Sequence, residues 1–182
     1  VSSTQHVAPP GAAKAAYGTN PLSFGFPTTG DPFVIDLGTS AFMSTDMMFR
    51  ERRGELLPEG VAIDAQGKPT RDAKAARVGA LLSFGGYKGF ALAMAAQALG
   101  VFAGAGSDQE SNYGYLMMAM KPDLLVPLAD YRRQLSETLA RIKATPRQPG
   151  VDEIRLPGER SFKERAKHLR EGIVIDKFIY DA

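Results

Sequence analysis

The chain has 182 residues, of which 44% are hydrophobic and 23% charged, enough for one globular domain with a core or somewhat more. A formal net charge of +2 gives no electrostatic argument for a nucleic-acid partner. The chain has no cysteine, which excludes disulfides, thiolate metal sites and a cysteine nucleophile, and its two histidines, His6 and His168, lie far apart in sequence. We therefore expect no metal site and a cytoplasmic protein.

The apolar stretches predict neither a membrane span nor a signal peptide. The longest one, 90–105, contains Gln97 and glycines and is shorter than the roughly 20 residues that a span needs. Residues 1–6 have no basic region and no apolar region of the signal-peptide kind. They look like the end of a strand without an initiator methionine, and we expect that the chain was cut from a longer one.

The first predicted elements form a hairpin. Residues 22–26 alternate apolar residues with Ser23 and Gly25, 33–37 is a β-branched apolar run, and 28–32 between them has the composition of a turn. Asp36 is the one acid in the second run. It is either a strand-end residue that faces a ligand or a structural carboxylate with a partner, because an unpaired carboxylate is costly to bury.

The next segment predicts a helix, a strand and a short helix. Residues 38–40 could cap a helix over 41–52, whose methionines suit core or interface packing. Residues 61–64 predict a strand, and 71–78 a short polar helix or an irregular segment.

A glycine-rich turn with one lysine then leads into an apolar helix. Gly85 and Gly86 end an apolar run, and Lys88 and Gly89 precede the helix predicted from residue 90. Glycines let backbone N–H groups approach a ligand, and a helix N-terminus carries partial positive charge. Lys88 adds a full charge, so this turn suits a phosphate or a carboxylate; the alternative is a plain tight turn before a core helix. The Walker and Gly-x-Gly-x-x-Gly patterns are both absent.

The remaining chain mixes short strands and helices without a strict βαβ rhythm, which favours an α+β or irregular α/β fold. Apolar residues at helical spacing predict an amphipathic helix over 129–144. The other predicted elements are a glycine-rich loop at 104–112, a buried strand at 114–120, a short strand at 153–156, a second phosphate-type turn at 157–160, a charged helix at 161–171 capped by Ser161, a strand or turn at 172–175 and a short helix at 176–182.

The residues by themselves indicate anion binding and no catalytic base. Acidic residues interrupt the basic helix at 162–170, so we interpret it as a solvated face rather than a nucleic-acid surface. Two isolated histidines support no Ser/His/Asp constellation. The anion sites that the pattern favours are Lys88 and the turn 158–160.

Four motifs in order carry a resemblance that adds to this interpretation. They are Gly18-Thr19-Asn20-Pro21, Ile35-Asp36-Leu37-Gly38-Thr39-Ser40, Leu57-Pro58-Glu59-Gly60-x-Ala62-x-Asp64-x-x-Gly67-x-Pro69-Thr70 and Gly85-Gly86-Tyr87-Lys88-Gly89. Together they resemble the second type of malate/L-lactate dehydrogenase family, which includes ureidoglycolate dehydrogenases, diketogulonate reductases and cyclic imino-acid reductases. The resemblance covers nearly the whole chain but only the C-terminal half of a family member.

The resemblance implies a non-Rossmann NAD(P)-binding fold with a mixed sheet and packed helices. Residues 1–120 would form a cofactor-binding core, incomplete at the N-terminus, and 121–182 a helical segment that returns to the catalytic domain. The cofactor would be NAD or NADP, with Arg160 favouring the 2′-phosphate of NADP. By motif match, the nucleotide contacts would be Ser3, Asp36, Leu37, Gly38, Lys88, Gly89, Gly158, Glu159 and Arg160, and Thr19 and Asn20 would lie beside the nicotinamide or substrate pocket.

The implied activity is an oxidoreductase that interconverts a small 2-hydroxy acid and a 2-oxo acid or reduces a cyclic imino acid. It would act as a homodimer, with no nucleic acid and no membrane as partner. The family's catalytic histidine and Ser-His-Gly motif belong to the absent N-terminal portion, so we expect no catalytic residue in this chain and no activity unless a separate portion completes the site. Thr45-Asp46 also replaces a Gly-Lys pair usual in the family. The alternatives are a non-catalytic nucleotide-binding or interaction module left by truncation, and a plain structural domain.

Overall fold

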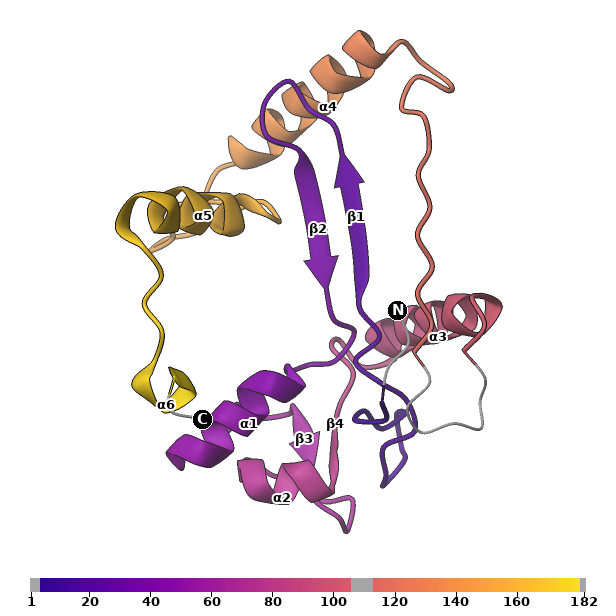
Figure 1. Ribbon diagram of the computed structural model, residues 1–182, viewed down its shortest axis with the longest axis vertical. Helices are drawn as coiled ribbons and strands as arrows, with labels where there is room; N and C mark the ends of the chain where they lie inside the picture. Colours follow the sequence, from indigo (N-terminus) through magenta and orange to yellow (C-terminus); the bar gives the residue numbers. More distant parts are fainter. Residues whose placement is uncertain (1–3, 106–112, 181–182) are drawn as a thin grey trace. The chain divides into compact units, whose positions relative to one another are not determined.

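The computed structural model describes residues 4–105 and 113–180, and its elements follow one another as drawn in Figure 1. The chain divides into two units, residues 1–23 with 37–119 and residues 24–36 with 120–182, so the hairpin tip groups with the C-terminal part. The elements are β1 (Leu22–Phe26), β2 (Phe33–Leu37), α1 (Ser44–Arg53), β3 (Ala62–Ile63), α2 (Ala73–Val78), β4 (Ala80–Leu81), α3 (Tyr87–Phe102), α4 (Leu128–Lys143), α5 (Glu159–Glu171) and α6 (Lys177–Tyr180).

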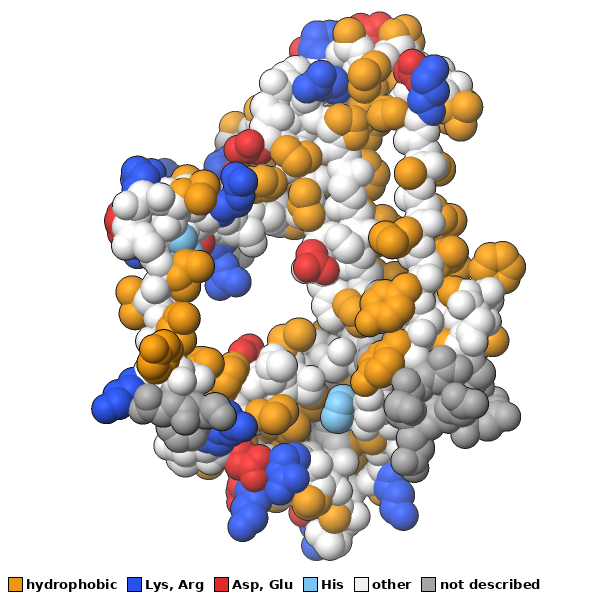
Figure 2. Space-filling model, viewed as in Figure 1, with side chains coloured by type: hydrophobic (Ala, Val, Ile, Leu, Met, Phe, Trp, Pro, Cys, Tyr) orange, Lys and Arg blue, Asp and Glu red, His pale blue; other side chains and the backbone are white. Residues whose placement is uncertain are grey.

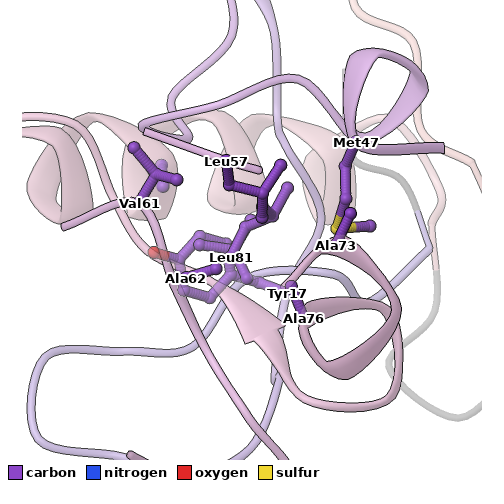
Figure 3. Packing of buried hydrophobic residues seen from close by; sticks show 10 residues of the cluster. Tyr17, Met47, Leu57, Val61, Ala62, Ala73, Ala76 and Leu81 are labelled. Atoms are coloured by element: carbon purple, nitrogen blue, oxygen red, sulfur yellow. The ribbon is translucent and has the colours of Figure 1, made fainter. Parts of the chain in front are cut away.

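The core of the first unit surrounds a very short antiparallel ladder. In it Ala62 of β3 lies opposite Leu81 of β4, and an isolated bridge joins Val7 to Leu81. Figure 3 shows side chains of α1, α2 and the two strands meeting around Leu81. The buried cluster consists of Val7, Tyr17, Met47, Leu57, Val61, Ala62, Ala73, Ala76, Leu81 and Ala93. Of the methionines predicted for core or interface packing, Met47 is therefore a core residue.

One face of α3 packs against this core through small residues. Its buried positions are Gly89, Ala93, Ala96 and Gly100, at spacings of four, three and four residues. This spacing puts them on one side of the helix. The short side chains let the backbone of α3 approach its neighbours closely, which sets the position of its N-terminal turn.

The second unit holds the tip of the β1–β2 hairpin against α4. The rings of Phe26 and Phe33 stack with their centroids 6.1 Å apart beside the predicted turn. The Thr28 carbonyl accepts from Arg132 of α4, and the Thr29 N–H donates to the Ser136 hydroxyl at 3.1 Å. Both contacts use backbone groups of the turn that have no ladder partner, so the turn anchors the helix.

The predicted helix caps are wrong for two helices. α1 begins at Ser44 with Met43 as its N-cap, without a side-chain cap. The hydroxyl of Ser40 donates instead to the Phe42 carbonyl at 2.7 Å, so it is not available to the helix. α5 begins at Glu159, two residues before the predicted cap Ser161. Gly158 at φ 84° makes the entry into this helix, because glycine adopts the left-handed region without steric cost.

The buried strand predicted at 114–120 is also wrong. The structure has no strand there, and Met117 is 94% and Met120 81% exposed. The strand predicted at 153–156 is likewise absent from the structure. In both cases the composition suits a strand, but the described residues place no neighbouring strand beside it. Of the loop predicted at 104–112, residues 106–112 lie outside the described ranges. Among the described residues, no helix is both long and apolar enough to cross a membrane.

Candidate functional site

The N-terminal turn of α3 presents a free cation and free donors. Gly85 and Gly86 have φ of 55° and 61°, and a Cβ on either would meet no atom within 4 Å, so the space before the helix is open. Lys88, the second helical residue, is exposed and has no ion-pair partner among the residues described. The first turn of a helix also leaves backbone N–H groups without intrahelical acceptors. The turn can therefore bind an anion.

Gly89 has a packing role in this turn. A Cβ added to it would lie 2.0 Å from the Phe84 carbonyl oxygen and 3.0 Å from the Phe84 carbonyl carbon. Real side chains do not approach a backbone atom so closely. The absence of a side chain at Gly89 thus lets the first turn of α3 pack directly against the Phe84 backbone.

Thr19 and Gly38, far apart in sequence, lie together next to this helix start. The N–H and the hydroxyl of Thr39 both donate to the Thr19 carbonyl at 2.8 Å. The Thr39 carbonyl in turn accepts from the Phe84 N–H at 3.2 Å. Gly38 is in the same place, because a Cβ on it would lie 3.7 Å from the Thr19 carbonyl oxygen. Three segments carrying predicted site residues therefore meet in the first unit.

Asn20 joins the Gly18–Pro21 segment to α3 through side-chain hydrogen bonds. Its side chain is fully buried, and its Nδ2 donates to the Ala93 carbonyl and to Gln97 Oε1, both at 3.0 Å. Its Oδ1 is buried and accepts no hydrogen bond from the residues that the structure describes. Its φ of 39° is the one positive value among the described residues other than glycine, and asparagine tolerates that region better than most. The amide thus fixes the register between the loop and α3.

In the second unit, the turn at Gly158 packs on β2 beside Asp36. A Cβ on Gly158 would lie 2.8 Å from the Val34 carbonyl oxygen, so α5 begins directly against the strand. Asp36 follows Val34 by two residues and is exposed. Arg160, the second residue of α5, is also exposed and has no ion-pair partner within the described parts of the chain.

Glu159 is already engaged by neighbouring groups. Its carboxylate accepts from Lys143 and, at 3.1 Å, from the Leu156 N–H. The Lys143 hydrogen bond lowers the pKa of Glu159, and the same bond raises the pKa of Lys143. Lys163 donates to Glu153 at 3.0 Å and lowers the pKa of that carboxyl. This network joins α4 to the start of α5.

The structure adds neither Ser3 nor the two histidines to these two groups of residues. Ser3 lies outside the described residues. His6 is exposed, and His168 lies 3.7 Å from Glu164 on the surface of α5. The described residues contain no cluster of three potential metal ligands. One surface hollow between α1 and α2 is lined by charged residues and Met48, and it involves none of the predicted site positions.

The sequence analysis missed a buried polar pair next to the helix start. The hydroxyls of Tyr17 and Ser83 lie 2.6 Å apart, with Tyr17 4% exposed. Burial raises the pKa of Tyr17, an effect that the Ser83 hydrogen bond partly offsets. Tyr17 directly precedes the Gly18–Pro21 motif, and Ser83 lies two residues before the Gly85–Gly89 turn. Their position at the boundaries of two motifs was the available signal.

The structure has an irregular α+β fold in which the apolar helix α3 begins at a glycine turn with an exposed lysine. The sequence has no Gly-x-Gly-x-x-Gly loop. The family model for malate/L-lactate dehydrogenase matches residues 1–182, and the chain belongs to this family. A Delta(1)-pyrroline-2-carboxylate/Delta(1)-piperideine-2-carboxylate reductase of Pseudomonas aeruginosa is 38% identical in an alignment of 183 positions that covers 96% of this chain and 54% of that protein. An L-sulfolactate dehydrogenase of Methanothermobacter thermautotrophicus is 33% identical and matches over 94% of this chain and 52% of its own length.

Solved structures agree in fold. The Delta1-piperideine-2-carboxylate reductase of Pseudomonas syringae pv. tomato superposes over 100% of this chain and 57% of its own, with a TM-score of 0.80 and 34% identity. The sulfolactate dehydrogenase of Methanocaldococcus jannaschii covers 99% of this chain and 55% of its own, with a TM-score of 0.86 and 30% identity. The chain thus spans about half the length of the relatives that it matches.

Proposed function

We propose that the chain forms the nucleotide-binding portion of an NAD(P)-dependent oxidoreductase acting on a small 2-oxo or 2-hydroxy acid or a cyclic imino acid. Family membership supports the reaction class, and relatives are named as reductases of cyclic imino acids and dehydrogenases of sulfolactate and malate. The observation that carries the proposal is Lys88, an exposed cation without a partner among the described residues, in the first turn of the apolar helix α3.

The helix start fits a dinucleotide phosphate. Lys88 would hold the phosphate charge, and the N–H groups of the first turn would donate to its oxygens. Gly85 and Gly86 leave the approach open. In this proposal Leu37, Gly38 and Gly89 line the nucleotide path, while Thr19 and Asn20 support the nicotinamide or substrate end. When bound, the nicotinamide would supply or accept the hydride.

Residues of the second unit are proposed as further nucleotide contacts. Asp36, exposed at the end of β2, would accept from hydroxyl or amide groups, and its charge makes a phosphate contact unfavourable. Arg160 would favour a 2′-phosphate, and hence NADP over NAD. Gly158 and Glu159 would hold Arg160 in place, since both anchor the turn from which α5 begins. Ser3 is proposed on motif match alone.

The proton donor for the substrate is proposed to come from outside these residues. Reduction of a 2-oxo acid needs a proton at the carbonyl oxygen as well as a hydride. Neither His6 nor His168 matches the catalytic histidine that the resemblance implies. We propose that a family N-terminal portion completes the site, and that the complete protein is a cytoplasmic homodimer.

Thermal stability with and without nucleotide tests the cofactor proposal. A ligand at 100 times its Kd stabilises the folded state by about 2.7 kcal/mol, so millimolar NADH or NADPH should raise Tm by several degrees. Lys88→Ala should lose the shift, whereas Lys74→Ala, which removes an exposed lysine of α2 in the same unit, should keep it. No shift in the unaltered chain would contradict nucleotide binding, and an unchanged shift in Lys88→Ala would remove Lys88 from the site.

The alternative is a non-catalytic nucleotide-binding module. This alternative also predicts that Lys88→Ala loses the thermal shift, but it predicts no enzyme activity. Fusion to the portion of the Pseudomonas aeruginosa reductase that this chain does not match should restore NAD(P)H oxidation with a cyclic imino acid if the chain is part of an enzyme. A fused chain that binds nucleotide but oxidises none would favour the module.

A further inference from the structure

The outward side of α3 is apolar although it faces solvent. From Gly89 to Ala105 the sequence contains no charged residue and one polar side chain, Gln97. A helix that is apolar on all sides is typically buried on all sides. Here only the small-residue face is buried, whereas Leu92, Leu99, Val101 and Phe102 are exposed, Phe102 to 82%.

The extended segment 115–119 adjoins the end of this helix and is apolar on both faces. It is positioned by Gly114, on which a Cβ would lie 2.4 Å from the Gly100 carbonyl oxygen of α3. Tyr115, Met117 and Met118 are all exposed, and hydrophobic side chains follow the segment in Figure 2. Within the described parts of the chain, 115–119 make no backbone hydrogen bond. A strand that is apolar on both faces is typical of a sheet interior with both faces covered.

The first described residues of the chain lie beside this segment. The Thr4 hydroxyl and the Tyr113 hydroxyl are 2.8 Å apart, and Val7 bridges to Leu81 in the core. A polypeptide joined to the N-terminal side of this chain would therefore lead to Thr4, which lies beside Tyr113 and near the C-terminal end of α3. The matched relatives are nearly twice as long as the region they share with this chain.

We infer that the outward side of α3 and the segment 115–119 form one docking surface for the remaining portion of the family fold, joined ahead of residue 1. The segment 115–119 pairs with a strand of that portion through its free N–H and C=O groups. Its methionines and the outward leucines of α3 become buried on both sides of the new ladder. A second copy of this chain is the competing occupant. The inference rests on family membership and not on nucleotide binding.

Amide hydrogen exchange in two forms of the protein tests this inference. One form is the 182-residue chain, and the other carries, fused ahead of residue 1, the portion of the Pseudomonas aeruginosa reductase that lies outside its match. Residues 115–119 should exchange fast in the first form, because their amides are free, and slow by about 100-fold or more in the second. Unchanged exchange of 115–119 in a fused chain that unfolds cooperatively would overturn the inference.

Mixing the two parts as separate polypeptides gives the second test, scored by co-purification. Leu92→Glu and Met117→Glu should lose capture while keeping the Tm of the isolated chain, since both side chains are exposed. Val78→Glu is the control and should keep capture, because Val78 is an exposed apolar residue at the end of α2, outside the proposed surface. If the relative's own two parts reassemble but this chain is not captured, the inference fails. A stable dimer of the isolated chain that Leu92→Glu dissociates, with no capture, would make a second copy the occupant.

Discussion

Gly89→Ala at the start of α3 changes protein stability in opposite directions through packing and through helix propensity, so its melting temperature shows which effect is larger. Alanine favours helices over glycine by about 1 kcal/mol, so propensity alone predicts a more stable protein. The structure predicts the opposite. The new methyl carbon would lie 2.0 Å from the Phe84 carbonyl oxygen, an overlap of more than about 1 Å given ordinary carbon–oxygen contacts near 3.3 Å.

The overlap is with backbone, so it cannot be relieved by a side-chain rotation. Overpacking of this kind costs about 1–3 kcal/mol, occasionally more, and exceeds the gain in propensity. An overpacking cost of about 3 kcal/mol less the propensity gain of about 1 kcal/mol leaves a net loss of about 2 kcal/mol. At about 2–4 °C per kcal/mol for a chain of this size, Tm should fall by roughly 4–8 °C. Circular dichroism melting measures it, with Ala91→Gly as control: position 91 is exposed in the same helix and should lose about 1 kcal/mol through propensity alone.

A Gly89→Ala variant that melts at or above the temperature of the unaltered chain would refute the close approach of α3 to Phe84. A variant with unchanged Tm but no response to NADH or NADPH would instead make Gly89 a nucleotide contact. The two readouts together decide which role glycine has at this position.

Three further predictions concern buried and paired polar groups. Asn20→Ala should lower the free energy of unfolding by about 1–3 kcal/mol, because Gln97 and the Ala93 carbonyl lose a buried donor. Asn20→Gly should be less harmful if the positive φ of 39° adds backbone strain in the alanine variant, and denaturant unfolding compares the two. The raised pKa of Tyr17 means that its neutral form stabilises the fold fully below about pH 10 and that this contribution is lost as pH rises further. Tyr17→Phe should therefore reduce the loss of stability above pH 10, and an unchanged dependence on alkaline pH would contradict this prediction. The lowered pKa of Glu159 means that its carboxylate stabilises the fold above about pH 4.3 and that this contribution is lost as pH falls further. Glu159→Gln should therefore weaken the loss of stability in acid, and an unchanged acid slope in denaturant unfolding would contradict this prediction.

The sequence pattern predicted those strands and helices that are determined by residues close together in the chain. Alternation at 22–26 and a β-branched run at 33–37 predicted β1 and β2, and helical spacing predicted a helix over 129–144, where α4 runs from Leu128 to Lys143. The caps failed because a hydroxyl such as that of Ser40 has several possible partners, and only the folded chain selects one. The strand predicted at 114–120 failed because its composition reflects burial that the described residues do not provide.

Long-range relations were beyond the reach of the sequence pattern. The Asn20 amide bonds to positions 73 and 77 residues later, and the Gly158 turn packs on Val34 of a distant hairpin. For the candidate site, the Gly85–Gly89 pattern correctly placed a lysine at a helix start, since glycine and helix signals are local. Whether Lys88 binds a phosphate depends on a ligand, and it stays a prediction.

A crystal structure of the chain soaked with NADPH tests the central claim most directly. The account predicts a phosphate of the nucleotide at the first turn of α3, with the Lys88 ammonium about 2.8 Å from a phosphate oxygen, the usual length of a charge-assisted hydrogen bond. Nucleotide bound with its phosphates away from Lys88, or a helix start left without nucleotide at saturating concentration, would contradict it.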